Sequence, residues 1–285
     1  MREPLLSVIK DLIARAGEAP LPVIALTDEE IAALDGDLAQ RGPVPLPWLD
    51  GKDKAARELA CQVALRGLAA RRLVIPLGPE GDTAAEGGEV GRGAEGGDVG
   101  RGYIALRDDL RAVLAMRRSA HAAVFALRES DGRMRLLYLG TSGALEEAIS
   151  PGGLHGFTVV ARAAAAERLA AFADPEDAAV AALQPGRESE PRVLPLAEIA
   201  RGAEIPAMAG VRSVTMVTRL VFGADAGEQR ATVYAKEAGV VVACPADASG
   251  APALRFAEVS RSGLRECLAG LLSIQEPVAS SGDQS

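Results

Sequence analysis

Residues 211–222 read VRSVTMVTRLVF, and this alternating pattern predicts one long β-strand with a well-buried side. The more apolar face carries Val214, Met216, Leu220 and Phe222. We expect this face to pack on helices, because burial of apolar side chains drives folding. The opposite face carries Ser213, Thr215, Val217 and Arg219. We expect that face to be open, since an antiparallel sheet can leave one side in water.

The segments after this strand continue as an antiparallel β-meander. Turn-forming residues separate predicted strands at 229–236, 239–244 and 253–259, and a helix is predicted at 260–272. A similar order occurs earlier in the chain. There, strands are predicted at 121–128, 134–140 and 156–161, followed by an Ala-rich helix at 163–172.

The few aromatic residues fall at matching places in the two groups of strands. The first group carries Phe125, Tyr138 and Phe157, and the second carries Phe222, Tyr234 and Phe256. A general preference of aromatic residues for strands explains each position singly but explains the shared order less well. The shared order therefore indicates an internal duplication.

These patterns predict an α+β protein whose central antiparallel sheet is built from two related β-meander/helix units and flanked by helical bundles. We expect an N-terminal helical region at 1–120, the first meander with its helices at 121–184 and a linker at 185–210. The second meander with its helix should span 211–273, and a disordered tail should span 274–285.

Composition and charge narrow the class of protein. The formal net charge is −8 and 48% of the residues are hydrophobic, which indicates a globular protein whose field repels phosphate backbones. The three cysteines are far apart and have no metal-binding spacing, as expected of reduced thiols. Lys10 and Asp11 interrupt the apolar N-terminal stretch, so a signal peptide is not expected. We therefore expect a cytoplasmic protein with no membrane insertion and no nucleic-acid partner.

A tandem repeat lies within the N-terminal region. Residues 85–93 read AEGGEVGRG, and residues 94–102 repeat them almost unchanged as AEGGDVGRG. Glycine loses much backbone entropy on ordering, and the repeat offers little apolar surface in return. We expect residues 85–102 to form a mobile Gly-rich insertion.

The segments around this insertion allow a second interpretation. Thr27 and Glu30 predict a capping box, and Asp53 opens a helix that ends near Arg72. This helix, two short strands around the insertion and a helix from Asp108 match the order of a winged helix-turn-helix. Arg66, Arg71 and Arg72 would then contact phosphates. The alternative hypothesis is a winged-helix regulator with a C-terminal β-rich ligand-binding or dimerisation domain.

A search for catalytic chemistry finds no signature. The sequence has no phosphate-binding Gly-x-x-x-x-Gly-Lys loop, no Gly-x-Ser-x-Gly elbow and no His-x-x-x-His pair. His121 and His155 lack acidic partners at a suggestive spacing, so we expect structural or solvent-facing roles. We place the acidic pair Glu146-Glu147 at a helix start or on a helical face. We expect no enzyme activity, no cofactor and no metal site.

The layout as a whole resembles the EspG family of ESX (type VII) secretion-associated proteins. The resemblance runs from about Pro22 to Leu272 and depends on order and architecture. It is carried by LTDEE at 26–30, the prolines through Pro47, RGLAAR at 66–71, DLRAVL at 109–114, and the two meander units, the second running from VTRL at 217–220 to LAGLL at 268–272. The repeat at 85–102 departs from the family pattern.

The resemblance implies a cytosolic chaperone that binds a helical PE–PPE-like pair and keeps it soluble for secretion. It does not place the contact residues by motif. From the strand pattern, we predict that Ser213, Thr215, Val217 and Arg219 bind the partner, because a mixed surface of this kind stays soluble alone and still offers apolar area.

Overall fold

The computed structural model describes residues 3–35, 44–77, 103–179, 190–205, 209–222, 229–237, 239–248 and 250–273. The chain forms two compact units. The first unit comprises residues 1–120 and 131–161, and the second comprises residues 121–130 and 162–285. The repeat at 85–102 and the predicted tail at 274–285 lie outside the described residues.

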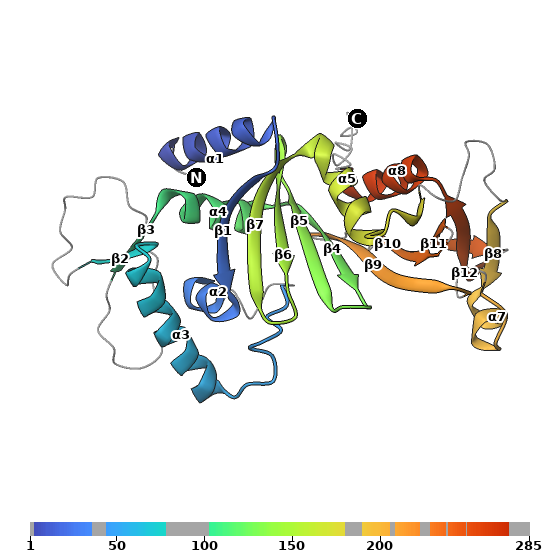
Figure 1. The fold of residues 1–285 in the computed structure, drawn as a ribbon, viewed down its shortest axis with the longest axis horizontal. Helices are drawn as coiled ribbons and strands as arrows, with labels where there is room; N and C mark the ends of the chain where they lie inside the picture. The colour runs from blue at the N-terminus through green and yellow to red at the C-terminus, as the bar shows by residue number, and fades with distance from the viewer. Residues whose placement is uncertain are drawn as a thin grey trace, which may run out of the picture. The chain divides into compact units, whose positions relative to one another are not determined.

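The first unit contains four antiparallel strands in the order β1-β7-β6-β5 (Figure 1). Their bounds are β1 Leu21–Thr27, β5 Arg133–Leu139, β6 Gly143–Ile149 and β7 Leu154–Ala161. A separate hairpin pairs β2 (Val74–Leu77) with β3 (Tyr103–Leu106). The helices are α1 Glu3–Ala16, α2 Asp28–Asp35, α3 Lys54–Ala70 and α4 Asp108–Ser119.

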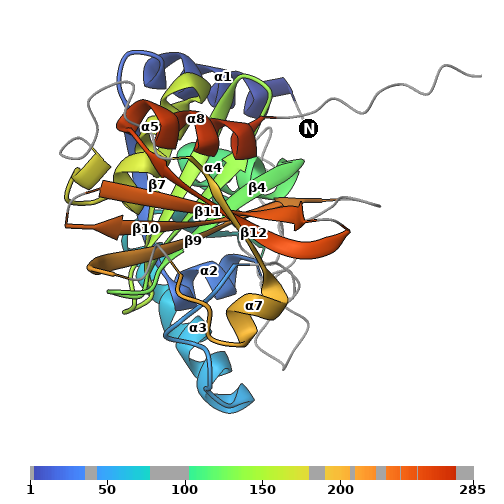
Figure 2. The same ribbon diagram turned by 90° about the vertical axis from the view of Figure 1, so that its right-hand side faces the viewer.

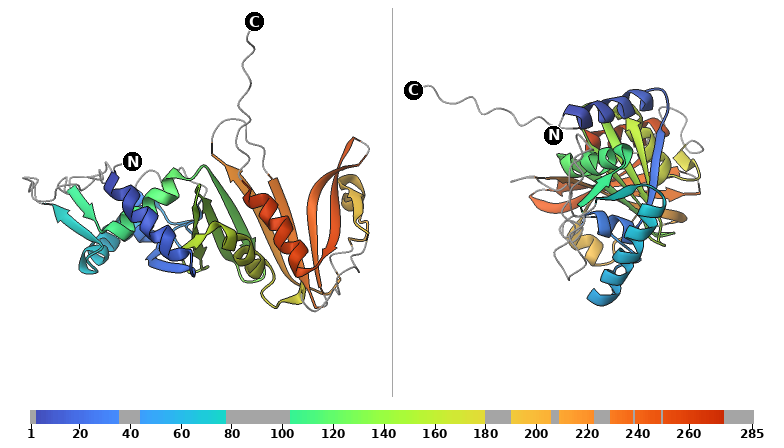
Figure 3. Two further views of the ribbon diagram at one scale, coloured as in Figure 1. Left: turned by 90° about the horizontal axis from the view of Figure 1, so that it is seen from above. Right: turned by 90° about the vertical axis from the view of Figure 1, so that its left-hand side faces the viewer.

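Helices α1 and α4 form one packed pair of this unit (Figure 3). Helix α1 buries Leu5, Leu12 and Ala16, which recur at helical spacing, and it contacts β7. Helix α4 buries Leu110, Val113 and Leu114 and contacts β1 and β6. A second pair, α2 and α3, adjoins β1 and β2.

The second unit contains six antiparallel strands in the order β4-β9-β10-β11-β12-β8. Their bounds are β4 Ala122–Arg128, β8 Arg192–Pro195, β9 Val211–Val221, β10 Gln229–Lys236, β11 Gly239–Ala248 and β12 Ala251–Val259. Helices α5 (Arg162–Ala173) and α8 (Arg261–Leu272) pack together on one side of these strands, and the short α7 (Leu196–Ala200) lies on the other side (Figure 2).

The predicted fold class is confirmed: the chain is α+β, with antiparallel strands flanked by helices, and the order of four strands followed by a helix occurs twice. Two strands were not predicted, namely β6 and β8. Strand β8 and helix α7 lie in the expected linker at 185–210. The expected unit at 121–184 is also divided, because β4 and α5 belong to the second unit while β5, β6 and β7 belong to the first.

The predicted helix caps are present. The backbone N–H of Thr27 donates to Glu30 Oε2 at 3.1 Å, and the Glu30 N–H donates to Thr27 Oγ1 at 3.4 Å, which is the reciprocal capping box. Asp53 accepts a bond from the Ala56 N–H at 2.8 Å and begins α3. Within the described ranges, no helix combines the length and apolarity that a bilayer crossing demands.

Candidate functional site

The four residues predicted to bind a partner are buried. Thr215 and Val217 have no exposed surface, and Ser213 and Arg219 are each 6% exposed. Both α5 and α8 contact β9, and these residues form the side of the strand that the helices cover. The prediction of an open Ser213/Thr215/Val217/Arg219 face is therefore wrong. This face packs on the helices, and the face expected to be covered is the accessible one.

The covered face of β9 is the more polar one. Helix α5 buries Ala165, Ala166 and Ala170 together with the larger Leu169 and Phe172. Arg219 remains in the covered layer through a hydrogen bond from its Nη1 to Gln229 Oε1 at 3.2 Å. The face of β9 that packs on the helices is therefore not the face with more apolar residues.

A second arginine shares this layer. Arg162 Nη2 donates to the carbonyl oxygen of Leu272 in the last turn of α8, where the helix dipole favours a cation. Burial lowers the pKa of Arg162, and the nearby charge of Arg219 lowers it further. The end of α8 therefore offsets part of the cost of holding two guanidinium groups close together.

The opposite face of β9 is the accessible one. Met216 is 40% exposed, and the strand register places Leu127 of β4 and Thr232 of β10 beside it. We define the open β9 face as the apolar side chains on this side of β4 and β9. They are Phe125, Leu127, Val214, Met216 and Leu220.

Helix α3 of the first unit presents a second apolar surface. Leu59 is 63% exposed and Val63 is 58% exposed, although they lie one turn apart on the same side of the helix. The α3 stripe consists of Ala56, Leu59, Ala60, Val63 and Gly67, and only Leu68 of this helix is buried. In Figure 1, α3 lies beside α2, on the side of α2 away from strands β1, β7 and β6. Exposed aliphatic side chains at helical spacing are the usual form of a helix-docking surface.

A charged cluster is buried inside the first unit. His155 has no exposed side-chain surface, and its Nε2 lies 2.6 Å from Asp28 Oδ1 while its Nδ1 lies 2.7 Å from Glu147 Oε1. Glu147 Oε2 accepts from the Tyr138 hydroxyl at 2.5 Å and from Arg117 Nε at 3.3 Å. The cluster joins residues of α2, α4, β5, β6 and β7.

The geometry assigns the charge state of this histidine. An ionised carboxylate only accepts hydrogen bonds, so with both carboxyl groups ionised the two ring nitrogens both donate and His155 is an imidazolium. Burial alone would lower the pKa of His155, but the bonds to Asp28 and Glu147 raise it. Burial likewise opposes ionisation of Glu147, yet its pKa is lowered by the bond to His155 and the charge of Arg117.

This cluster has a structural role. His155, Asp28 and Glu147 are fully buried, so a substrate in solution cannot contact them. The placement of Glu146 and Glu147 on a helix is wrong, because both are buried in β6. The partners of His155 lie 8 and 127 positions away, which explains why spacing did not reveal them. The one available signal was an acidic pair inside an otherwise apolar segment.

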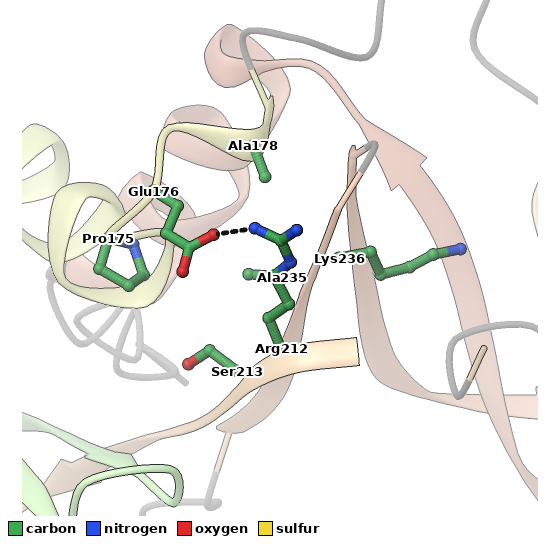
Figure 4. A pocket seen from close by; sticks show the side chains of 7 residues that line it. All are labelled: Pro175, Glu176, Ala178, Arg212, Ser213, Ala235 and Lys236. Carbon is green, nitrogen blue, oxygen red and sulfur yellow. Dashed lines mark hydrogen bonds and ion pairs between the residues drawn. The ribbon is translucent and has the colours of Figure 1, made fainter. Parts of the chain in front are cut away.

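Two further features offer no site. A hollow near Arg212 and Glu176, whose side chains are 2.7 Å apart, has room for about one water molecule (Figure 4). In the part of the chain that the structure describes, no group of three or more His, Cys, Asp and Glu side chains could hold a metal ion.

One arginine of the winged-helix hypothesis, Arg71, is held in an ion pair within the first unit. The order α3-β2-β3-α4 is present as predicted. However, Arg71 Nη1 donates to Glu30 Oε1 at 2.7 Å, and its Nη2 donates to the Ala25 carbonyl oxygen at 3.0 Å. Arg71 therefore joins α3 to α2 and β1, which leaves it poorly placed for a phosphate.

Comparison with known proteins shows a likeness of fold. No protein-family profile matches the chain, and no curated protein matches its sequence. The chain resembles one in the solved structure of the Mycobacterium tuberculosis type VII secretion system chaperone EspG5 in complex with a PE25–PPE41 dimer. The TM-score is 0.51 at 8% identity, and the match covers 87% of this chain and 95% of that one. The resemblance to the EspG family is confirmed at the level of the fold.

Proposed function

We propose that this protein is a cytoplasmic chaperone or adaptor that binds a helical, PE–PPE-like pair of secretion substrates and has no catalytic role. The observation that supports this proposal is the fold similarity, which covers 87% of this chain and 95% of the other. The type VII chaperone in that structure is bound to such a pair.

The exposed surfaces support the proposal. A helical pair kept soluble before export presents apolar helix surfaces, and a binder needs matching apolar area that is tolerated in water. The α3 stripe offers such area, because Leu59 and Val63 are exposed. Ridges of a partner helix fit between side chains at this spacing. We propose the α3 stripe as the primary contact and the open β9 face as a secondary one.

Co-expression with a PE–PPE pair tests this function. We expect a tagged wild-type chain to retain the pair in a pull-down. Leu59→Asp and Val63→Asp should reduce retention by tenfold or more without lowering the melting temperature, because both positions are exposed. Glu58→Lys is the matched control, since it changes the charge of the same helix away from the stripe.

The possible outcomes distinguish which surface binds the pair from whether the chain binds the pair at all. If Met216→Asp abolishes retention and Leu59→Asp does not, the open β9 face is the primary contact. If the wild-type chain retains no PE–PPE pair while it is fully folded, the chaperone proposal fails.

The order α3-β2-β3-α4 keeps the winged-helix regulator as the second candidate. A regulator would bind duplex DNA with an affinity that falls steeply with salt, because each phosphate contact releases counterions. We expect no binding at physiological salt, given the net charge of −8 and the pairing of Arg71 with Glu30. A sequence-selective, salt-sensitive complex that is lost in Arg66→Ala would favour the regulator.

A further inference from the structure

The chain segments on both sides of α3 are hydrogen-bonded to the first turn of α2. Before the helix, the backbone N–H groups of Trp48 and Leu49 donate to Asp28 Oδ2 at 2.6 and 3.1 Å. After it, Arg71 Nη1 donates to Glu30 Oε1 at 2.7 Å. Asp28 and Glu30 belong to the same turn. One turn of α2 therefore holds both ends of the segment that carries the α3 stripe.

Between these two end contacts, α3 is only partly covered. The structure describes all of residues 50–67, and no side chain in this stretch is buried. The nearest buried side chains are Leu49 before it and Leu68 after it. Most of the stability of a helix in a protein comes from tertiary packing and not from intrinsic propensity. The position of the stripe therefore depends strongly on the contacts at its two ends.

The two end contacts differ in depth. The Asp28 side chain is fully buried, its Oδ1 lies 2.6 Å from His155 Nε2, and its backbone N–H donates to the Gly153 carbonyl oxygen at 2.9 Å. The side chain of Glu30 is 8% exposed, whereas that of Arg71 is 47% exposed. The contact at Asp28 is thus part of the interior cluster. The contact at Arg71 lies near the surface, where its removal opens no cavity in the core.

We propose that Glu30 and Arg71 are positioning residues, which hold the α3 stripe in the orientation that receives the apolar surface of a partner helix. This inference rests on the proposed function and deepens it, because it assigns part of the affinity to residues outside the contact surface. A stripe that is held in place before the partner arrives loses less conformational freedom on binding, so more of its contact energy remains as affinity.

Hydrogen exchange of the purified full-length chain, without a partner, tests whether α2 holds α3. In Arg71→Ala, amides of α3 should exchange about three to ten times faster than in wild type, as expected for one charge-assisted bond at a partly exposed site. Amides of β6 and β7 should keep their wild-type rates. Arg71→Lys retains the charge but lacks the planar fork that reaches both Glu30 and the Ala25 carbonyl oxygen, so its increase should be smaller. Arg72→Ala, at the next and exposed position, is the matched control and should leave the exchange of α3 unchanged.

The Kd for the co-expressed PE–PPE pair gives the second readout. Arg71→Ala should raise this Kd by about three- to tenfold, in step with the exchange of α3. Glu30→Gln keeps an oxygen that can accept the capping bond from Thr27 but removes the charge that faces Arg71. Because both substitutions weaken the same bond, the double variant should bind no more weakly than Arg71→Ala alone.

Three results would overturn the positioning role. They are wild-type exchange of α3 in Arg71→Ala, an equal rise of exchange in β6 and β7, and an unchanged Kd for a pair that the wild-type chain binds. If the wild-type chain binds no pair while α3 exchange rises as expected, the chaperone proposal fails and the hold of α2 on α3 stands.

Discussion

Replacing the buried imidazolium of His155 by the neutral amide of glutamine should weaken the first unit strongly. The cluster around His155 balances three carboxylates with three cations. The carboxylates are those of Asp28, Asp35 and Glu147, and the cations are Arg117, Arg118 and His155. His155→Gln removes one cation and leaves Asp28 and Glu147 in the protein interior with too few donors.

The magnitude follows from burial. Breaking a buried ion pair from one side costs about 3–5 kcal/mol, because the remaining charge stays desolvated. A unit of about 150 residues changes its melting temperature by roughly 2–4 °C per kcal/mol. We therefore expect His155→Gln to melt at least roughly 6 °C below the wild type at pH 6.5. A change of this size is a large part of the stability of an ordinary domain, which is about 5–15 kcal/mol.

The effect should depend on pH with a definite sign. The pKa of His155 is raised in the folded protein, so its contribution is complete below the unfolded value of about 6.5 and is lost as the pH rises through the folded pKa. The pKa of Glu147 is lowered, so its contribution is lost only as the pH falls well below neutral. As the pH rises above 6.5, wild-type stability should decrease relative to that of His155→Gln, and the gap between them should narrow.

Trp48, the only tryptophan, provides the assay. Its backbone N–H donates to Asp28 Oδ2 at 2.6 Å, so its fluorescence reports on a segment that the cluster holds in place. Urea unfolding at several pH values would give the free energy of unfolding of each variant. His121→Gln, at an exposed position, is the control and should match wild type. A loss below about 1 kcal/mol at pH 6.5, or a gap that widens with pH, would refute this account of the cluster.

Five further substitutions test the packing and one helix cap. Val217→Asp should lower the free energy of unfolding by about 3 kcal/mol or more in thermal melts, because it places a charge in the layer under the helices. Met216→Asp, on the other face, should change it by less than about 1 kcal/mol. Equal effects would contradict the observed orientation of β9. Gly153→Ala should destabilise the protein more than Gly51→Ala. Both glycines have a positive φ, +73° and +82°. A Cβ at Gly153 would lie 2.8 Å from the carboxyl carbon of Asp28, whereas a Cβ at Gly51 would have no atom within 4 Å. Asp53→Ala should cost about 1 kcal/mol through loss of the N-cap bond to α3, and an unchanged urea midpoint would show that this cap is dispensable.

Local chemistry in the sequence is sufficient to predict most of the elements. The strands at 211–221 and 229–236 and the helix at 261–272 follow from alternation, turn residues and helical spacing. The caps at Thr27 and Asp53 follow from side chains that reach only three positions along the chain. Interactions of such short range can be predicted without knowing what packs above them.

Strands β6 and β8 lack such local signals. Strand β6 contains Glu146 and Glu147, whose charges argue against a buried strand until Arg135 and His155 are placed beside them. Strand β8 has only four residues and pairs with β12, about sixty positions later. In both cases the stabilising partner is distant in sequence, so local propensity did not predict a strand.

Tertiary packing determined which residues of the candidate sites are exposed. Both faces of β9 carry apolar residues, so composition could not show which face α5 and α8 would cover. In the folded chain they cover Thr215 and Val217 and leave Met216 exposed. The sequence by itself determined most of the elements and the absence of a recognisable catalytic motif. Only the folded chain decided which side chains are exposed to a partner, because exposure depends on the shapes of surfaces that meet from distant parts of the sequence.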